Sequence, residues 1–136
     1  MATRYAAYGT TIGPTAEAVI AGVRSVTGPS LKADTIDVTT HDSTAAWEEA
    51  VVGILRSGDV KLEIEYDPLN ATHANAGHGL LAQFIARTAH SYTLTFPSAV
   101  AWVFSAFVTG FEPSAPHDKD LTATVTLKVT ANPTLA

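Results

Sequence analysis

Residues 105–130 constrain the fold more than any other part of the chain, because they predict two strands joined by a proline-punctuated loop. The second strand alternates between apolar and polar residues. Its apolar face carries Leu121, Ala123, Val125, Leu127 and Val129, and its polar face carries Thr122, Thr124, Thr126, Lys128 and Thr130. The apolar face is expected to pack on a core. The threonine-rich face neither buries fully nor repels neighbouring chains, which points to assembly or to a solvent-filled surface rather than to catalysis.

Length and charge limit the classes that remain. At 136 residues the chain is expected to form a single domain, 1–136, with roughly 6,800 Å² of surface if it is a compact monomer. Only 15% of the residues are charged, so we expect part of the surface to be covered by partners. The net charge of −5 argues against a basic nucleic-acid footprint.

The sequence also limits bonding and location. Without cysteine the chain forms neither disulfides nor thiolate metal sites. No apolar run reaches the ~18 residues that a membrane-spanning helix needs, and the N-terminus lacks the apolar stretch of a secretory signal. We therefore expect no membrane insertion by this chain.

Periodicity predicts an antiparallel β-sandwich or barrel with one flanking α-helix. Residues 1–18 show no lasting periodicity and are expected to form an N-terminal arm or a short hairpin that orders by docking. The predicted strands are 19–27, 35–40, 59–67, 91–96, 100–111 and 121–130, and the predicted helix is 77–89.

The predicted helix has an apolar stripe that should pack on the sheet. Gln83 and Arg87 are expected on the opposite, polar side. The stripe consists of Leu80, Leu81, Phe84, Ile85 and Thr88.

Residues 41–58 predict an exposed excursion from the sheet. Asp42 or Ser43 could cap a short helix there. Trp47, Val51 and Leu55 recur at helical spacing, although Gly53 weakens a continuous helix. The excursion thus carries large apolar side chains on a segment that a monomer would leave in water.

Candidate chemistry is sparse, and we expect no catalytic residue, no cofactor and no metal site. The chain contains no nucleophile-elbow sequence Gly-x-Ser-x-Gly. Glu63 and Glu65 point the same way from one strand, as acid/base pairs can, but a solvated face beside Lys61 explains them better. The histidines lack the spacing of a zinc motif and are interpreted as polar loop residues; they are His41, His73, His78, His90 and His117.

Six aromatic residues either line a ligand groove or pack in the core, and their positions along successive strands favour the core. They are Tyr92, Phe96, Trp102, Phe104, Phe107 and Phe111. Strict alternation sends Trp102 with Phe104 to one side and Phe107 with Phe111 to the other.

Two motifs carry a family resemblance. The segment Lys32 to Ser43 with Trp47-Glu48-Glu49, and the loop Phe107 to Pro116 before the threonine-rich strand, resemble the tail tube (major tail) proteins of long, non-contractile-tailed bacteriophages. The resemblance covers the chain from about residue 19 to the end. It implies a β-sandwich with one helix that assembles into six-subunit rings, stacked into a hollow tube through which DNA leaves the capsid.

The resemblance also implies where the protein works and with what. It places the chain in the virion tail, assembled in the bacterial host cytoplasm, beside tape measure, tail terminator and distal tail proteins. Strands of all subunits would join around the bore into one ring barrel, and a long loop would reach the next ring. Related tubes occur in contractile tails and in type VI secretion.

Together these observations assign candidate surfaces. Residues 41–58 are the expected inter-ring loop, with contacts by Trp47, Val51, Ile54 and Leu55. The residues expected to face the lumen are Glu63, Glu65, Thr122, Thr124 and Thr126, because DNA passes a neutral or acidic hydrophilic wall without sticking. Two alternatives remain. One is a non-polymerising β-sandwich binding module, such as a capsid decoration or a tail-tip receptor- or carbohydrate-binding protein, and the other is a small sandwich enzyme.

Overall fold

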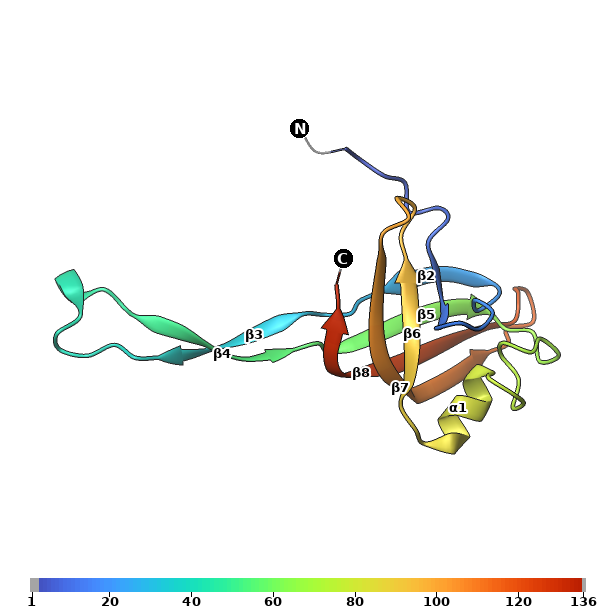
Figure 1. Cartoon of the computed structure of the whole chain (residues 1–136). Coiled ribbons are helices and arrows are strands. Elements are labelled where there is room, and N and C mark those ends of the chain that lie inside the picture. Colours follow the sequence, from blue (N-terminus) through green and yellow to red (C-terminus); the bar gives the residue numbers. More distant parts are fainter. Residues whose placement is uncertain (1–2, 136) are drawn as a thin grey trace.

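The computed structural model describes residues 3–135, which fold into a curled antiparallel sheet, a flanking helix and a long projecting hairpin (Figure 1). The six-stranded sheet has the order β1-β6-β7-β8-β5-β2, and β3 pairs with β4 in the hairpin. The mostly-β prediction with one flanking helix is confirmed. The elements are β1 (Thr11–Pro14), β2 (Val23–Thr27), β3 (Lys32–Asp37), β4 (Ala50–Arg56), β5 (Asp59–Glu65), α1 (Leu80–Ala86), β6 (His90–Thr95), β7 (Ala101–Ser114) and β8 (Thr122–Thr134).

The two longest strands, β7 and β8, pair at the centre of the sheet. The alternation predicted for β8 is confirmed, because Ala123, Val125, Leu127 and Val129 are buried. On its other side β8 pairs with β5, whose apolar residues at positions 60, 62 and 64 are buried as well. One face of the sheet therefore supplies the core and the opposite face stays polar.

Register shifts in the β7–β8 pairing interrupt the alternation that the sequence suggests. One shift lies between Val108 and Gly110. Beyond it Phe111 lies opposite buried Val125 and packs edge-on against Tyr66, with ring centroids 5.1 Å apart. The expectation that Phe107 and Phe111 share a face is therefore wrong, because a bulge adds one residue and reverses the parity of the strand beyond it.

Helix α1 is shorter than predicted and turned differently. Leu80 is buried as expected, but so is Gln83, while Phe84 and Ile85 are 44% and 59% exposed. The predicted stripe is thus wrong for Phe84, Ile85 and Thr88, which are exposed, and the predicted polar side is wrong for Gln83. The helix packs on β7, spans only Leu80–Ala86 and ends at Arg87 in a left-handed conformation, so Thr88 and residue 89 of the predicted helix lie beyond its end.

The edges of the sheet are the short strands β1 and β2, and residues 15–22 connect them. Ile20 donates its amide hydrogen to Ile12 at 2.9 Å, and Glu65 donates to Gly22 at 2.8 Å. Gly13 is required in β1, because a Cβ there would lie 2.6 Å from the Cα of Val19. Of the predicted N-terminal arm, Thr11–Pro14 forms β1, and residues 1 and 2 lie outside the described part.

Residues 41–58 do not form the expected short helix. A 3-10 turn at Thr44–Ala46 has no side-chain cap from Ser43, whose hydroxyl instead accepts a hydrogen bond from the Thr40 amide at 3.0 Å. The chain then continues as strand β4, so Trp47, Val51 and Leu55 do not share a helical stripe. Its β-branched residues favour extended backbone, and this preference outweighs the apolar spacing.

The projecting hairpin of β3 and β4 and the exposed residues 3–9 contribute to an unusually large surface. The chain exposes 9117 Å², against roughly 6,800 Å² for a compact monomer of its mass. The excess means that the projecting part is built without a core of its own. Across residues 3–135, every helix is too short or too polar to cross a membrane.

Two buried aromatic side chains in the body, His73 and Tyr92, differ in their hydrogen bonding. Buried His73 accepts a hydrogen bond from the Asp67 amide at 3.2 Å through Nδ1, and its Nε2 donates to the Ala21 carbonyl at 2.6 Å. It thereby joins the loop after β5 to the segment before β2. The Tyr92 hydroxyl is buried without a hydrogen-bond partner among the described residues, and burial raises the pKa of Tyr92 to about 12.

We expect His73→Phe to destabilise the subunit by about 1 to 3 kcal/mol, because it removes two part-buried hydrogen bonds, to the Asp67 amide and the Ala21 carbonyl. Tyr92→Phe is the matched control. It removes a buried hydroxyl that lacks a partner, so its free energy of unfolding should equal or exceed that of the wild type. Urea denaturation of the purified subunit, followed by circular dichroism, measures both. Equal losses in the two variants would contradict the assigned role of His73.

Candidate functional site

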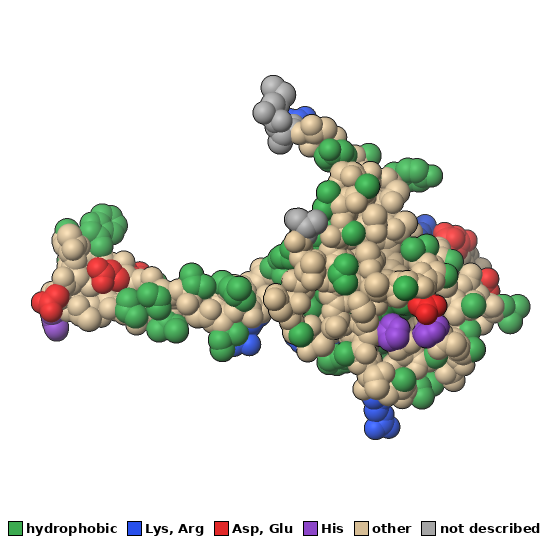
Figure 2. Space-filling model, viewed as in Figure 1, with side chains coloured by type: hydrophobic (Ala, Val, Ile, Leu, Met, Phe, Trp, Pro, Cys, Tyr) green, Lys and Arg blue, Asp and Glu red, His purple; other side chains and the backbone are tan. Residues whose placement is uncertain are grey.

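The hairpin formed by β3, its tip and β4, residues 32–56, is called the arm below. It projects from the body as a two-stranded ribbon (Figure 1). Its apolar side chains are open to solvent; Trp47 is 74% and Leu55 is 75% exposed. Val51 and Ile54 are also exposed, and Figure 2 shows hydrophobic side chains along the arm. All four predicted contact residues therefore lie on the arm and outside the core.

Polar contacts fix the base and the tip of the arm. At the base, Arg56 donates from Nε and Nη2 to Asp34 Oδ2 at 3.0 and 2.9 Å. This hydrogen bonding holds the pKa of Asp34 below its ordinary value. Near the tip, Glu49 donates its amide hydrogen to the Thr39 hydroxyl at 2.7 Å, and the Val38 amide donates to the Glu49 carbonyl at 2.9 Å. These contacts set the register of the ribbon without burying it.

The polar face of the sheet brings the predicted lumen residues together. Glu63 lies opposite Thr124 and Glu65 lies opposite Thr122, on the paired strands β5 and β8. Both glutamates are exposed, whereas Thr122 and Thr126 are half-buried. The five residues thus form one surface of carboxylates and hydroxyls on the side of the sheet that faces away from the core.

Glu112 belongs to the same surface, and the sequence analysis missed it. It lies opposite Thr124 on β7, so Glu63, Thr124 and Glu112 form a row across three strands. Counting alternate positions along β7 from Phe104 places Glu112 on the core side, because the bulge beside Gly110 is invisible to that count. A glycine within an otherwise β-branched and aromatic strand is the only sequence signal of such a bulge.

The histidines are scattered. His78 lies 3.4 Å from Glu17 and stacks near His90 with ring centroids 5.6 Å apart, while His41 and His117 are exposed. The prediction of polar loop histidines is wrong for His90, which begins strand β6, and His73 lies in a loop but is buried. Within residues 3–135, no group of three or more potential ligand side chains is arranged to hold a metal ion.

Comparison with known proteins follows from this architecture. The sequence matches the family model described as "Lambda phage tail tube protein, TTP" over residues 2–136. The chain belongs to the lambda phage tail tube protein family. This tail tube protein is therefore a tube-forming structural protein of the virion tail, and the predicted resemblance is confirmed. No curated protein sequence matches the chain.

Solved structures share its fold. A chain in "Virion of native gene transfer agent (GTA) particle" superposes with a TM-score of 0.81 at 14% identity, covering 98% of this chain and 99% of that chain. A chain in "Tail of empty GTA particle computed with helical refinement, C6 symmetry" gives 0.71 at 16% identity, covering 93% of each. A chain in the PVC "sheath/tube terminator in extended state" of an extracellular contractile injection system gives 0.72 at 16% identity, covering 96% and 95%.

We expect the arm of this tail tube protein to open far more readily than the sheet. A two-stranded ribbon without a core is marginally stable in water, whereas β5 and β8 are held on both sides. Hydrogen exchange of the free subunit should therefore be faster at residues 33–55 than at residues 60–64 and 123–129 by several orders of magnitude. Equal protection of the two regions would contradict this account.

Proposed function

We propose that this tail tube protein forms hexameric rings that stack into a hollow tube, the conduit for DNA ejection into the host. The observation that carries the proposal is the arm, whose apolar side chains project beyond the body and need a partner to bury them. The C6 symmetry of the similar GTA tail supports six subunits per ring. The open edges β1 and β2 support lateral pairing, since a ring covers edges that a monomer exposes.

Stacking of the rings is assigned to residues 41–58, of which 41–56 belong to the arm, and to the rest of the arm, residues 32–40. From Ala33 to the tip at Thr44 the chain runs about 12 residues, which at ~3.3 Å per residue reaches roughly 40 Å from the body. Trp47, Val51 and Leu55, together with Ile54, contact the adjacent ring in this proposal. Large exposed aromatic side chains are typical anchors of protein interfaces.

The lumen is assigned to the polar face of β5 and β8. It offers Glu63, Glu65, Thr122, Thr124 and Thr126, and the structure adds Glu112 to the same face. Carboxylates repel phosphates, and hydroxyl groups hydrate the wall without binding strongly, so DNA slides past.

The ends of the stack define the other partners. A tube of identical rings presents an uncovered arm layer at one end and an uncovered ring face at the other. Tail terminator and distal tail proteins are the proposed partners at the ends of the tube. The tape measure protein is the proposed partner in the bore. The similarity to a chain within a sheath/tube terminator assembly supports the terminator contact.

Trp47→Ala should leave the free subunit as stable as the wild type and abolish tube elongation, because Trp47 is 74% exposed and contributes to no core. Leu69→Ala is the control, since Leu69 is 94% exposed on a body loop away from the arm. Electron microscopy and sedimentation measure tube length and yield. Tubes of normal length from Trp47→Ala would refute the inter-ring assignment.

Glu63→Lys combined with Glu65→Lys should slow DNA ejection at low salt, because lysines on the wall contact phosphates. The delay should shrink as salt is added. Glu17→Lys, which changes a carboxylate beside His78, is the control. Ejection from virions carrying each variant is timed by dye fluorescence, and identical kinetics for the doubly substituted and wild-type virions would exclude a lumen position.

A further inference from the structure

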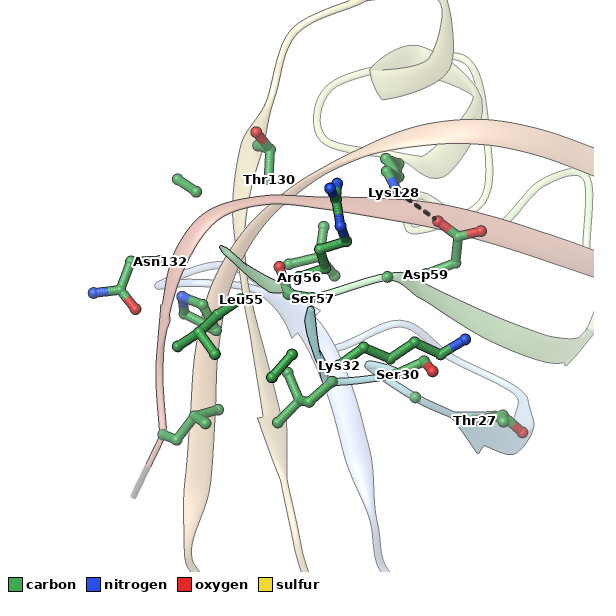
Figure 3. Close-up of a pocket in the computed structure, with 18 of the residues that line it drawn as sticks. Thr27, Ser30, Lys32, Leu55, Arg56, Ser57, Asp59, Lys128, Thr130 and Asn132 are labelled. Atoms are coloured by element: carbon green, nitrogen blue, oxygen red, sulfur yellow. Dashed lines mark ion pairs between the residues drawn. The ribbon is translucent and has the colours of Figure 1, made fainter. Parts of the chain in front are cut away.

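A groove of about 1320 Å³ lies at the base of the arm, between the arm and the end of β8 (Figure 3). Apolar side chains from both segments line it, including Leu31, Leu55 and Val129. The labelled side chains in Figure 3 come from the end of β2, from the start and end of the arm and the links beside it, and from β5 and β8. The groove is open, so another segment can enter it from outside.

Basic side chains concentrate around this groove. The chain has only eight lysines and arginines. Four of them line the groove, namely Lys32, Arg56, Lys61 and Lys128. The single carboxylate among the lining residues is Asp59, which lies 3.6 Å from Lys128. The lining side chains thus have a formal charge of +3, and Asp34, which is paired with Arg56, reduces the local charge to +2 in a chain whose net charge is −5.

The tip of the arm, residues 37–49, has the opposite character. It contains no lysine or arginine, and its four carboxylates give it a formal charge of −4 with His41 neutral. They belong to Asp37, Asp42, Glu48 and Glu49. Beside Glu48 stands the highly exposed Trp47, and Figure 2 shows acidic side chains at the far end of the arm and basic ones near its base.

We propose that this groove receives the arm tip of a second copy of the chain, with Trp47 against its apolar wall and Glu48 and Glu49 facing Lys32 and Lys61. The proposal rests on the proposed function and names the receiving surface of the adjacent ring. Opposite charges steer and orient the contact, while the buried tryptophan supplies most of its affinity.

The contact explains why the assembly is a filament. Tip and groove lie at opposite ends of one arm, so the contact joins two different surfaces and each docked copy presents a new tip or groove. Because each copy is displaced in the same direction, repeating this head-to-tail contact gives an open filament and not a closed ring. The spacing between successive copies is then set by the arm, at roughly 40 Å for about 12 extended residues.

The apolar walls favour a protein segment over nucleic acid as the occupant. Lysines and arginines alone would suit a phosphate backbone, but the groove places them around leucine and valine side chains. Only a ligand that combines acidic groups with a large apolar group matches both the basic and the apolar side chains of the groove. The arm tip is such a ligand, and every neighbouring copy carries one.

Zero-length carbodiimide cross-linking of assembled tubes tests the contact, because it couples only carboxylates and amines that touch. The chain has four lysines, and Lys119 is the one outside the groove. Tubes made from mixed light and heavy isotope-labelled subunits should give intermolecular links from the 37–49 peptide to Lys32, Lys61 or Lys128. The intramolecular Asp59–Lys128 pair is the internal positive control. Tip links to Lys119 alone, or no tip links while the control pair forms, would overturn the proposal.

Charge exchange provides an independent readout. Glu48→Lys with Glu49→Lys, and separately Lys32→Glu with Lys61→Glu, should each cause loss of tubes, whereas Lys119→Glu should not. Combining all four exchanges should restore tubes, since opposite charges meet again. Tubes at wild-type yield from the groove variant, or a fourfold variant as inactive as its parents, would argue against the groove.

The stacking role of the arm and the assignment of the groove can be disproved separately. If Trp47→Ala stops elongation while the tip links elsewhere, the arm still joins rings and only the groove assignment falls. If Trp47→Ala elongates normally, the arm does not join rings, and the proposed function loses its stacking contact.

Discussion

The long pairing of β7 with β8 is the constraint on which the rest of this structure depends. These strands occupy the centre of the sheet, and their register shifts curl it while the short strands β1 and β2 are left at the edges. The curl lets one face enclose a core of residues from all six strands and from α1. Because the sheet ends in two short edges, lateral growth by pairing with a neighbour remains open.

A core on one face leaves the other face available for a different task. Along β5 and β8 the parity of the strands separates buried aliphatic residues from carboxylates and hydroxyls, so the polar surface follows from the packing rather than from a separate element. Ion pairs on this face are exposed; Arg24 lies 3.7 Å from Glu65. Such exposed pairs contribute little stability, so folding places few demands on the composition of this surface.

Strands with intact alternation were predictable from sequence, and elements shaped by tertiary contacts were not. β5 and β8 follow strict parity, so their core and polar faces were identified residue by residue. Phe111 was misplaced and Glu112 was missed because a bulge adds one residue that no hydrophobic pattern records. His73 is buried where it bonds Asp67 and Ala21, and Gln83 is buried on a helix that packs on β7; single-element periodicity carries no information on such neighbours. Trp47 and its apolar companions were recognised as exposed, although their strand was not.

The arm also bears on when assembly occurs. A two-stranded ribbon loses conformational freedom when it docks, so a single tip inserting into a single groove gains little net free energy. In the proposed hexameric ring, six arms would dock on one surface at once, and each contact after the first is intramolecular. Addition to a complete ring is then strongly favoured over pairing of free subunits. In this proposal the marginal stability of the arm would restrict elongation to preformed rings, which a rigid arm would not do.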